Sequence, residues 1–246
     1  DAGNSSYGTA IVGTVSGTAI SFGTAVVFES ASSSYISATY DSTNNKVVIA
    51  YIDAGNSSYG TAIVGTVSGT SISFGTAVVF ESAQSAYISA TYDSTNGKVV
   101  IAYRDAGNSS YGTAIVGTVS GTSISFGTAV VFESASSSYI SATYDSTNGK
   151  IVIAYKDQGN SSFGTAVVYS LASSNNTSFI GITDAAISSA ASGSVTIKGG
   201  ISSNVSSLTP NATYYVQADG TLATTTSTVL AGKALSSTSI NLDYTT

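Results

Sequence analysis

The chain has 246 residues and a formal net charge of −6, and only 8% of its residues are charged, against about 25% in typical globular domains. Its few Lys and Arg residues are scattered singly, whereas nucleic-acid binding needs clustered cations that displace counterions. The chain contains no Cys and no His, which excludes disulfides, zinc and haem sites, and the Ser-His-Asp and Cys-His catalytic arrangements. We therefore expect no nucleic-acid partner, and the absence of a long apolar run predicts no membrane insertion.

Nearly the same text occurs three times in succession, and a fourth copy begins and then diverges. The motif D-[AQ]-G-N-S-S-[YF]-G-T-A recurs with a period of 52 residues, at Asp1, Asp53, Asp105 and Asp157. Tandem copies of this length predict an array of identical supersecondary units. The agreement ends at Tyr169, so we place the repeats at residues 1–172, a linker at 173–178 and an unrelated small β domain at 179–246.

Each copy predicts four antiparallel strands, which in one copy are Tyr87–Tyr92, Lys98–Tyr103, Thr113–Val119 and Ile124–Phe132. Asn96-Gly97 predicts a tight hairpin turn between the first two strands, because both residues tolerate positive φ. Gly127 predicts a bulge within the fourth strand. A Ser/Ala-rich loop is expected to lead from the fourth strand into the next copy.

Four antiparallel strands in about 50 residues, repeated in tandem, are typical of the blades of a β-propeller. The second strand is apolar on both faces, as expected for a blade that has a neighbour on either side. A β-solenoid and an intertwined trimeric fibre are the alternatives. We predict an all-β protein of tandem four-stranded antiparallel propeller-like blades, followed by a small β-sandwich-like C-terminal domain. Its strands are expected at Ser194–Lys198, Thr213–Ala218, Thr228–Leu230 and Ser239–Asp243.

Two passages resemble known protein families. The repeat text YISATYDSTNGKVVIAYRD and GTAIVGTVSGTSISFGTAVVF resembles repeats in tail-fibre and other virion proteins of marine bacteriophages. The later text VTIKGG…LTPNATYYVQADGTL…AGKALSSTSINL looks like a small domain common near the ends of phage structural proteins. The resemblance implies an extracellular component of the virion surface, in a tail fibre or spike. It also implies a homo-oligomer, often a trimer, that assembles with other virion proteins and in some cases contacts the host surface.

Two repeated sequences offer oxygen ligands to a cation. They are DSTNG, from Asp93 to Gly97, and DAGN, from Asp105 to Asn108. Neither has the carboxylates of a full calcium loop. We predict instead that Asp93 caps its hairpin turn and that Asp105 anchors its loop through hydrogen bonds from side chain to backbone. No metal or cofactor is expected.

Three glutamates, Glu29, Glu81 and Glu133, occupy one equivalent position in successive copies. Glycoside hydrolysis needs two carboxylates that flank one bond. Residues at equivalent positions would point the same way in different repeats, so these glutamates predict no converging pair. We therefore assign no catalytic residue and expect that the protein is not an enzyme.

The repeated loop GNSSYG offers amide and aromatic groups of the kind that hold sugars. Its candidate glycan contacts are Asn56, Tyr59, Asn108 and Tyr111, and repeated weak sites would gain by avidity. A packing role is the alternative, because Phe163 replaces this tyrosine in the last copy. The loops support a second functional hypothesis, a secreted or cell-surface glycan-binding lectin or adhesin.

Consecutive copies are nearly identical and would present like surfaces to one another. Each end of a short stack would then expose an apolar face, which is a liability unless something covers it. We predict that upstream repeats or neighbouring subunits cover the open end around residues 9–28.

Overall fold

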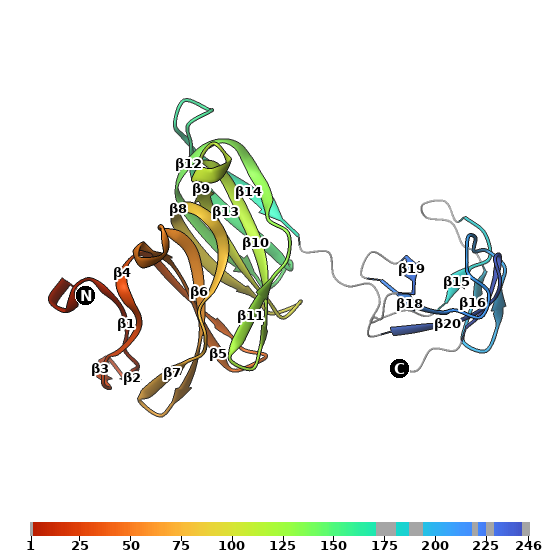
Figure 1. Cartoon of the computed structure of the whole chain (residues 1–246), viewed down its shortest axis with the longest axis horizontal. Helices are drawn as coiled ribbons and strands as arrows, with labels where there is room; N and C mark the ends of the chain where they lie inside the picture. The colour runs from red at the N-terminus through yellow and green to blue at the C-terminus, as the bar shows by residue number, and fades with distance from the viewer. Residues whose placement is uncertain (1, 171–180, 187–193, 218–220, 225–228, 243–246) are drawn as a thin grey trace. The chain divides into compact units, whose positions relative to one another are not determined.

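The computed structural model describes residues 2–170, 181–186, 194–217, 221–224 and 229–242 (Figure 1). The chain divides into two compact units, Asp1–Leu171 and Ala172–Thr246. Both units are all-β, as predicted: the helices among the described residues are three-residue 3₁₀ segments, and none of the described helices is long enough to cross a membrane. The predicted linker at 173–178 lies outside the described residues.

The first unit repeats its strands as it repeats its sequence. We number the repeats 1 (residues 2–34), 2 (35–86), 3 (87–138) and 4 (139–170). Repeat 1 contributes β1 (Tyr7–Ala10), β2 (Gly13–Ser16) and β3 (Ala19–Phe22). The strands that follow are β4 (Val26–Asp41), β5 (Lys46–Asp53), β6 (Tyr59–Ser68), β7 (Ser71–Phe74), β8 (Val78–Asp93), β9 (Lys98–Asp105), β10 (Tyr111–Ser120), β11 (Ser123–Phe126), β12 (Val130–Asp145), β13 (Lys150–Asp157) and β14 (Phe163–Tyr169). All neighbouring pairs are antiparallel.

One long strand joins each repeat to the next. β8 runs for 16 residues; its first half pairs with β6 of repeat 2, and its second half pairs with β9 of repeat 3. Tyr87, at the change of partner, has φ of 52° and falls within the register shift between Ala86 and Ser89. The prediction of a Ser/Ala-rich loop is therefore wrong. The segment is an extended strand because its backbone groups form hydrogen bonds first with one repeat and then with the next.

The predicted hairpin between the first and second strands is present but is not a two-residue turn. The last pair of the β8–β9 ladder is Asp93 with Lys98, so four residues form the loop. Gly97 has φ of 63°, while Asn96 does not have a positive φ. The loop is wider because the Asp93 carboxylate accepts hydrogen bonds from the amide groups of Thr95 and Asn96, both at 3.0 Å. The bulge predicted at Gly127 is wrong, because the fourth strand is interrupted there: β11 ends at Phe126 and β12 begins at Val130.

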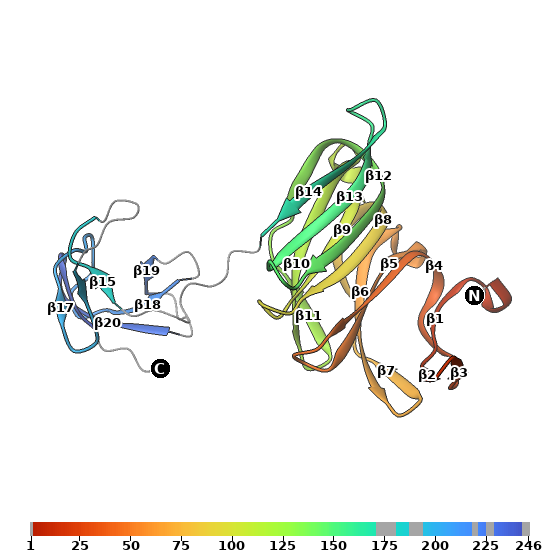
Figure 2. The same ribbon diagram turned by 180° about the vertical axis from the view of Figure 1, so that it is seen from behind.

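Successive repeats stack face to face, and β4, β8 and β12 follow one another as layers in both views (Figures 1 and 2). We call the side of a repeat that faces the preceding repeat its leading face, and the opposite side its trailing face. The trailing face of repeat 2 and the leading face of repeat 3 share one apolar core, formed by Val48, Ala50, Ile52, Ala62, Val64, Ile88, Tyr92, Val99, Ile101 and Tyr103. β9 is buried on both faces, as its continuous apolar sequence predicts.

The C-terminal unit contains a five-stranded antiparallel sheet in the order β17 (Ile201–Ser202), β21 (Ser239–Leu242), β20 (Val229–Ser236), β18 (Thr213–Val216) and β19 (Leu222–Ala223). A separate pair is formed by β15 (Ile182–Thr183) and β16 (Val195–Thr196). Each of the four predicted strand segments overlaps a strand, although β20 continues to Ser236, beyond the predicted end at Leu230; β15, β17 and β19 were not predicted. The core includes Tyr214, Val216, Ile240 and Leu242.

Candidate functional site

The candidate glycan contacts lie on a loop that has the same form in each complete repeat. Asp105 ends β9, and its carboxylate accepts hydrogen bonds from the amide groups of Gly107 at 2.9 Å and Asn108 at 3.2 Å. These bonds satisfy the first amide groups of the short helix η3 (Ala106–Asn108). The predicted anchoring role of Asp105 is confirmed, and Asp53 makes equivalent contacts in repeat 2.

The same loop is fitted closely to the strand beside it. A Cβ atom added to Gly107 would lie 2.5 Å from the Cβ of Ala83, so only glycine allows this approach to β8. Ser109 and Ser110 then take left-handed conformations, with φ of 53° and 63°, and β10 starts at Tyr111. Such backbone conformations are uncommon for residues other than glycine. The repeated loop is thus a defined structure on the surface.

The structure separates the four candidate contacts into one Asn and Tyr pair per repeat. Asn56 and Asn108 are exposed, and Tyr59 and Tyr111 are half-buried. Tyr111 begins β10, where it lies in the ladder between Asp105 of β9 and Ser136 of β12. Each loop therefore carries an exposed asparagine and, three residues later, a half-buried tyrosine, and the two loops occupy equivalent places in consecutive repeats.

The three glutamates are each bonded to a tyrosine of the following repeat. The hydroxyl groups of Tyr51, Tyr103 and Tyr155 donate to Glu29, Glu81 and Glu133 at 3.1, 3.0 and 2.9 Å. Burial, together with the adjacent carboxylate, raises the pKa of Tyr103 well above its usual range and that of Tyr155 to about 12. These glutamates therefore hold one repeat to the next, each engaged with a different tyrosine.

The Glu–Tyr pairs were missed in the sequence because 22 residues separate the partners. The signal that could have found them is their joint recurrence in each copy. Each tyrosine ring also packs against a phenylalanine of the preceding fourth strand, with Phe80 and Tyr103 edge to face at 5.2 Å between centroids. Within the described part of the chain, no three acidic side chains gather into a group that could hold a metal ion.

The hairpin turns with the sequence DSTNG are the other candidate cation site. Their aspartate carboxylates accept hydrogen bonds from residues of the same turn. In the last copy the side-chain amide of Asn148 donates to Asp145 at 2.6 Å, and this bond holds the pKa of the Asp145 carboxyl below its ordinary value. The amide groups of Thr147 and Asn148 also donate to it. The predicted role of Asp93 as a turn cap is confirmed by the same contacts in repeat 3.

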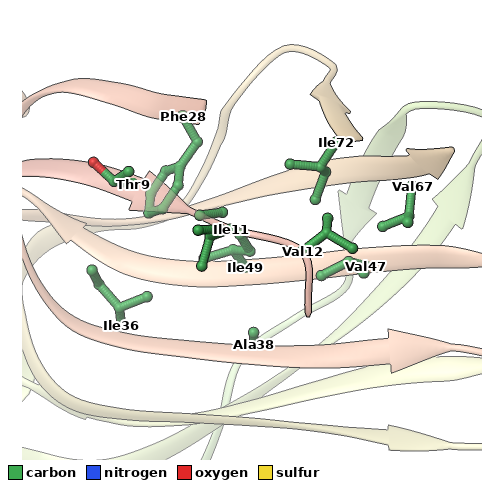
Figure 3. Close-up of a pocket in the computed structure, with 11 residues that line it drawn as sticks. Thr9, Ile11, Val12, Phe28, Ile36, Ala38, Val47, Ile49, Val67 and Ile72 are labelled. Carbon is green, nitrogen blue, oxygen red and sulfur yellow. The ribbon is translucent and has the colours of Figure 1, made fainter. Parts of the chain in front are cut away.

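An apolar cavity of about 380 Å³ lies on the leading face of repeat 2 (Figure 3). Its walls come from residues 9–12 and Phe28 of repeat 1, from Ile36, Ala38, Val47 and Ile49 on β4 and β5, and from Val67 and Ile72. Two residues on this face are far more exposed than the equivalent residues of repeat 3, which a preceding repeat covers. Ile36 is 48% exposed and Ile88 is 7% exposed, while Tyr40 is 55% exposed and Tyr92 is 8% exposed.

Within the described part of the repeat unit, the trailing face of repeat 4 is exposed as well. Val168 is 63% exposed, although Val64 at the same position of repeat 2 has no exposed surface. Ala154 is exposed, while its counterpart Ala102 is buried. The two ends of the stack thus present the two halves of the interface that the interior repeats form with each other.

No protein-family model, no curated protein and no solved structure matches this chain.

Proposed function

We propose that this chain is a repeat-built structural component of a virion appendage, a phage tail fibre or spike exposed at the virion surface. The observation that carries the proposal is the packing between repeats. Repeats 2, 3 and 4 are joined by apolar cores that recur and by the long strands β8 and β12, each of which passes from one repeat into the next. A rigid stack of this kind suits a mechanical role in which the repeats hold a surface away from the particle. The assignment to a virion rests on the resemblance of the repeat sequence to phage virion proteins.

The repeats of this component are propeller-like blades in our proposal. Support comes from the strand order, in which the first, second, third and fourth strands of a repeat are neighbours and the fourth continues into the first strand of the next. Burial of β9 on both faces also suits a blade between blades. The C-terminal unit is proposed as a small sandwich-like domain that docks on other virion proteins or joins copies of the chain.

This role requires no catalytic centre, cofactor or metal. The polar side chains that recur once per repeat make structural contacts: Asp105 anchors a loop, Asp93 caps a turn and Glu81 bonds Tyr103. We therefore propose that the protein is not an enzyme.

The second candidate function is glycan binding by a secreted or cell-surface lectin or adhesin. The observation that favours it is the repeated loop, which carries an exposed asparagine, Asn56 or Asn108, and a half-buried tyrosine three residues later. Within a tail fibre, the same loops would serve contact with glycans of the host surface.

Immunogold electron microscopy of virus particles from the source of the sequence tests the first proposal. Antibodies against the 246-residue chain should label an appendage of purified particles, and pre-immune serum should not. Labelling confined to cell surfaces or secreted material would refute a virion role. A glycan array tests the second: binding by the native chain that is lost in the Asn56→Ala, Asn108→Ala double variant would establish the lectin function.

A further inference from the structure

We propose that repeat 4 of a second copy of this chain occupies the open leading face of repeat 2, so that copies associate head to tail. The inference rests on the proposed structural function and names the partner that completes it. The choice of occupant follows from two interfaces within the chain, between repeats 2 and 3 and between repeats 3 and 4. In each of them a trailing face packs against a leading face.

The interior interfaces share the same polar contacts. The amide group of Ala90 donates to Ser37 Oγ at 2.9 Å, and that of Ala142 donates to Ser89 Oγ at 2.9 Å. The hydroxyl of Tyr92 donates to Thr43 Oγ1 at 2.6 Å, and Tyr144 and Thr95 make the equivalent hydrogen bond. A leading face therefore recognises a trailing face through one amide–serine and one tyrosine–threonine contact.

The leading face of repeat 2 and the trailing face of repeat 4 carry the residues for these contacts, and the residues are exposed. On the leading face of repeat 2, Ala38 and Tyr40 are exposed, and the Tyr40 hydroxyl turns to Asn45 of its own repeat at 3.0 Å. On the trailing face of repeat 4, Ser141 and Thr147 are exposed. In a second copy these two residues stand where Ala38 and Tyr40 require Ser and Thr partners.

The docking needs one strand to give way. Repeat 4 supplies first, second and third strands, while repeat 1 supplies third and fourth strands, so two third strands compete for one place. Among the described strands β1 pairs only with β4, whereas β14 is held within repeat 4 by seven pairs with β13. Either third strand would form with β4 the four-residue ladder that β6 forms with β8 and β10 with β12. Because only β14 brings a paired second strand and a trailing face with it, we infer that β1 is displaced and β14 pairs with β4.

The glycines of the third strands support this exchange. A Cβ atom on Gly60 or Gly112 would lie 2.5 Å from a ring atom of Phe80 or Phe132, so each glycine is covered by a fourth-strand phenylalanine. Among the described residues, no atom comes within 4 Å of the corresponding point on Gly164 in β14. The first half of β4 carries Phe28, which would cover Gly164 of the second copy.

The two contacting faces differ, so the association is heterologous and extends as a closed ring or an open filament. Each added copy would bury the apolar lining of the cavity and the exposed Val168 together. The occupant is thus defined by its shape and chemistry: a trailing face that bears Ser141 and Thr147, beside strand β14, which among the described strands pairs only with β13.

Engineered cysteines test the proposal, because the native chain contains none. A chain with Ala38→Cys mixed with a chain with Ser141→Cys should form a disulfide-linked heterodimer under mild oxidation. The internal pair Ser89→Cys with Ala142→Cys should close within one chain and calibrates the geometry. Absence of the heterodimer where the internal pair closes would overturn the proposal. So would a yield of the Ala38→Cys homodimer equal to that of the heterodimer.

Sedimentation of the whole chain over a concentration series gives an independent readout. Val168→Asp should weaken association about tenfold or more, since it buries a charge in the contact. Val79→Asp is the matched control, because Val79 is exposed even inside the stack. Deleting residues 1–10 should strengthen association by removing β1. A monomer at all concentrations, or weaker association after the deletion, would refute the inference, and neither result would alter antibody labelling of virus particles.

Discussion

The Gly75→Ala substitution tests whether neighbouring repeats are in close backbone contact. Gly75 lies at the break in the fourth strand of repeat 2, and its amide group donates to the carbonyl of Val64 at 2.9 Å. A Cβ atom at this position would lie 2.0 Å from the carbonyl oxygen of Thr122, in the β10–β11 turn of repeat 3. The added methyl group would therefore collide with backbone, which moves less readily than the end of a side chain.

The expected cost follows from the size of this overlap. Carbon and oxygen atoms in contact lie about 3.3–3.6 Å apart, so the turn of repeat 3 must shift by more than about 1 Å. Overpacking of a well-packed site costs about 1–3 kcal/mol. We expect the upper half of this range, about 2–3 kcal/mol, because the β10–β11 hairpin must move as a unit against β6.

Gly127→Ala is the matched control within the same chain. Gly127 is the equivalent residue of repeat 3, and a Cβ atom there would meet, among the described residues, only the carbonyl oxygen of Val116 at 3.8 Å. In urea unfolding of the whole chain, Gly75→Ala should lower the transition midpoint and the free energy of unfolding of the repeat unit. Gly127→Ala should change that free energy by no more than about 0.5 kcal/mol. Equal destabilisation by both substitutions would refute close packing between repeats 2 and 3 as the cause.

Three further predictions concern single contacts. Tyr103→Phe should destabilise the repeat unit by about 1–3 kcal/mol in urea unfolding, because it removes the hydroxyl group that donates to Glu81 in a buried site. Gly97→Val should cost about 1–3 kcal/mol through strain at φ of 63°, whereas Gly97→Asn should be milder, since repeat 2 has Asn at this position. Asn148→Ala should raise the pKa of Asp145 toward 3.8, as followed by NMR titration. The folded pKa of Asp145 is depressed, so its stabilising contribution is present above the unfolded value and is lost as the pH falls through the folded pKa.

Each of these has a contrary outcome. A loss from the exposed Tyr139→Phe variant equal to that from Tyr103→Phe would show that the Glu81 hydrogen bond is not responsible. Equal costs for valine and asparagine at Gly97 would exclude backbone strain. An unchanged pKa of Asp145 in the Asn148→Ala variant would mean that the side-chain amide does not hold the carboxylate.

The local features of the repeat followed from the sequence because their causes are local. The positive φ of Gly97 and the capping roles of Asp93 and Asp105 depend on residues within three positions along the chain. The apolar run of β9 predicted a strand covered on both faces, since only such a strand can bury every side chain. The loop that carries Asn108 was recognisable as a repeated surface element for the same reason.

Contacts between repeats were decided by the tertiary structure. The Ser/Ala-rich segment before Tyr87 has no marked preference of its own, and it is a strand because β6 and β9 in turn bond its backbone. Glu81 and Gly75 meet partners that lie 22 and 47 residues further along the chain. No pattern within one copy indicates those distances.

Burial was the property least accessible to the sequence. Ile36 and Ile88 lie in the same local sequence, YISATYDSTN, and would be assigned the same environment by any local pattern. One is 48% exposed and the other 7% exposed. The sequence of a repeat determines which surface is apolar, but whether that surface is buried depends on the presence of a neighbouring repeat, because the hydrophobic effect acts on area removed from water and not on residue identity.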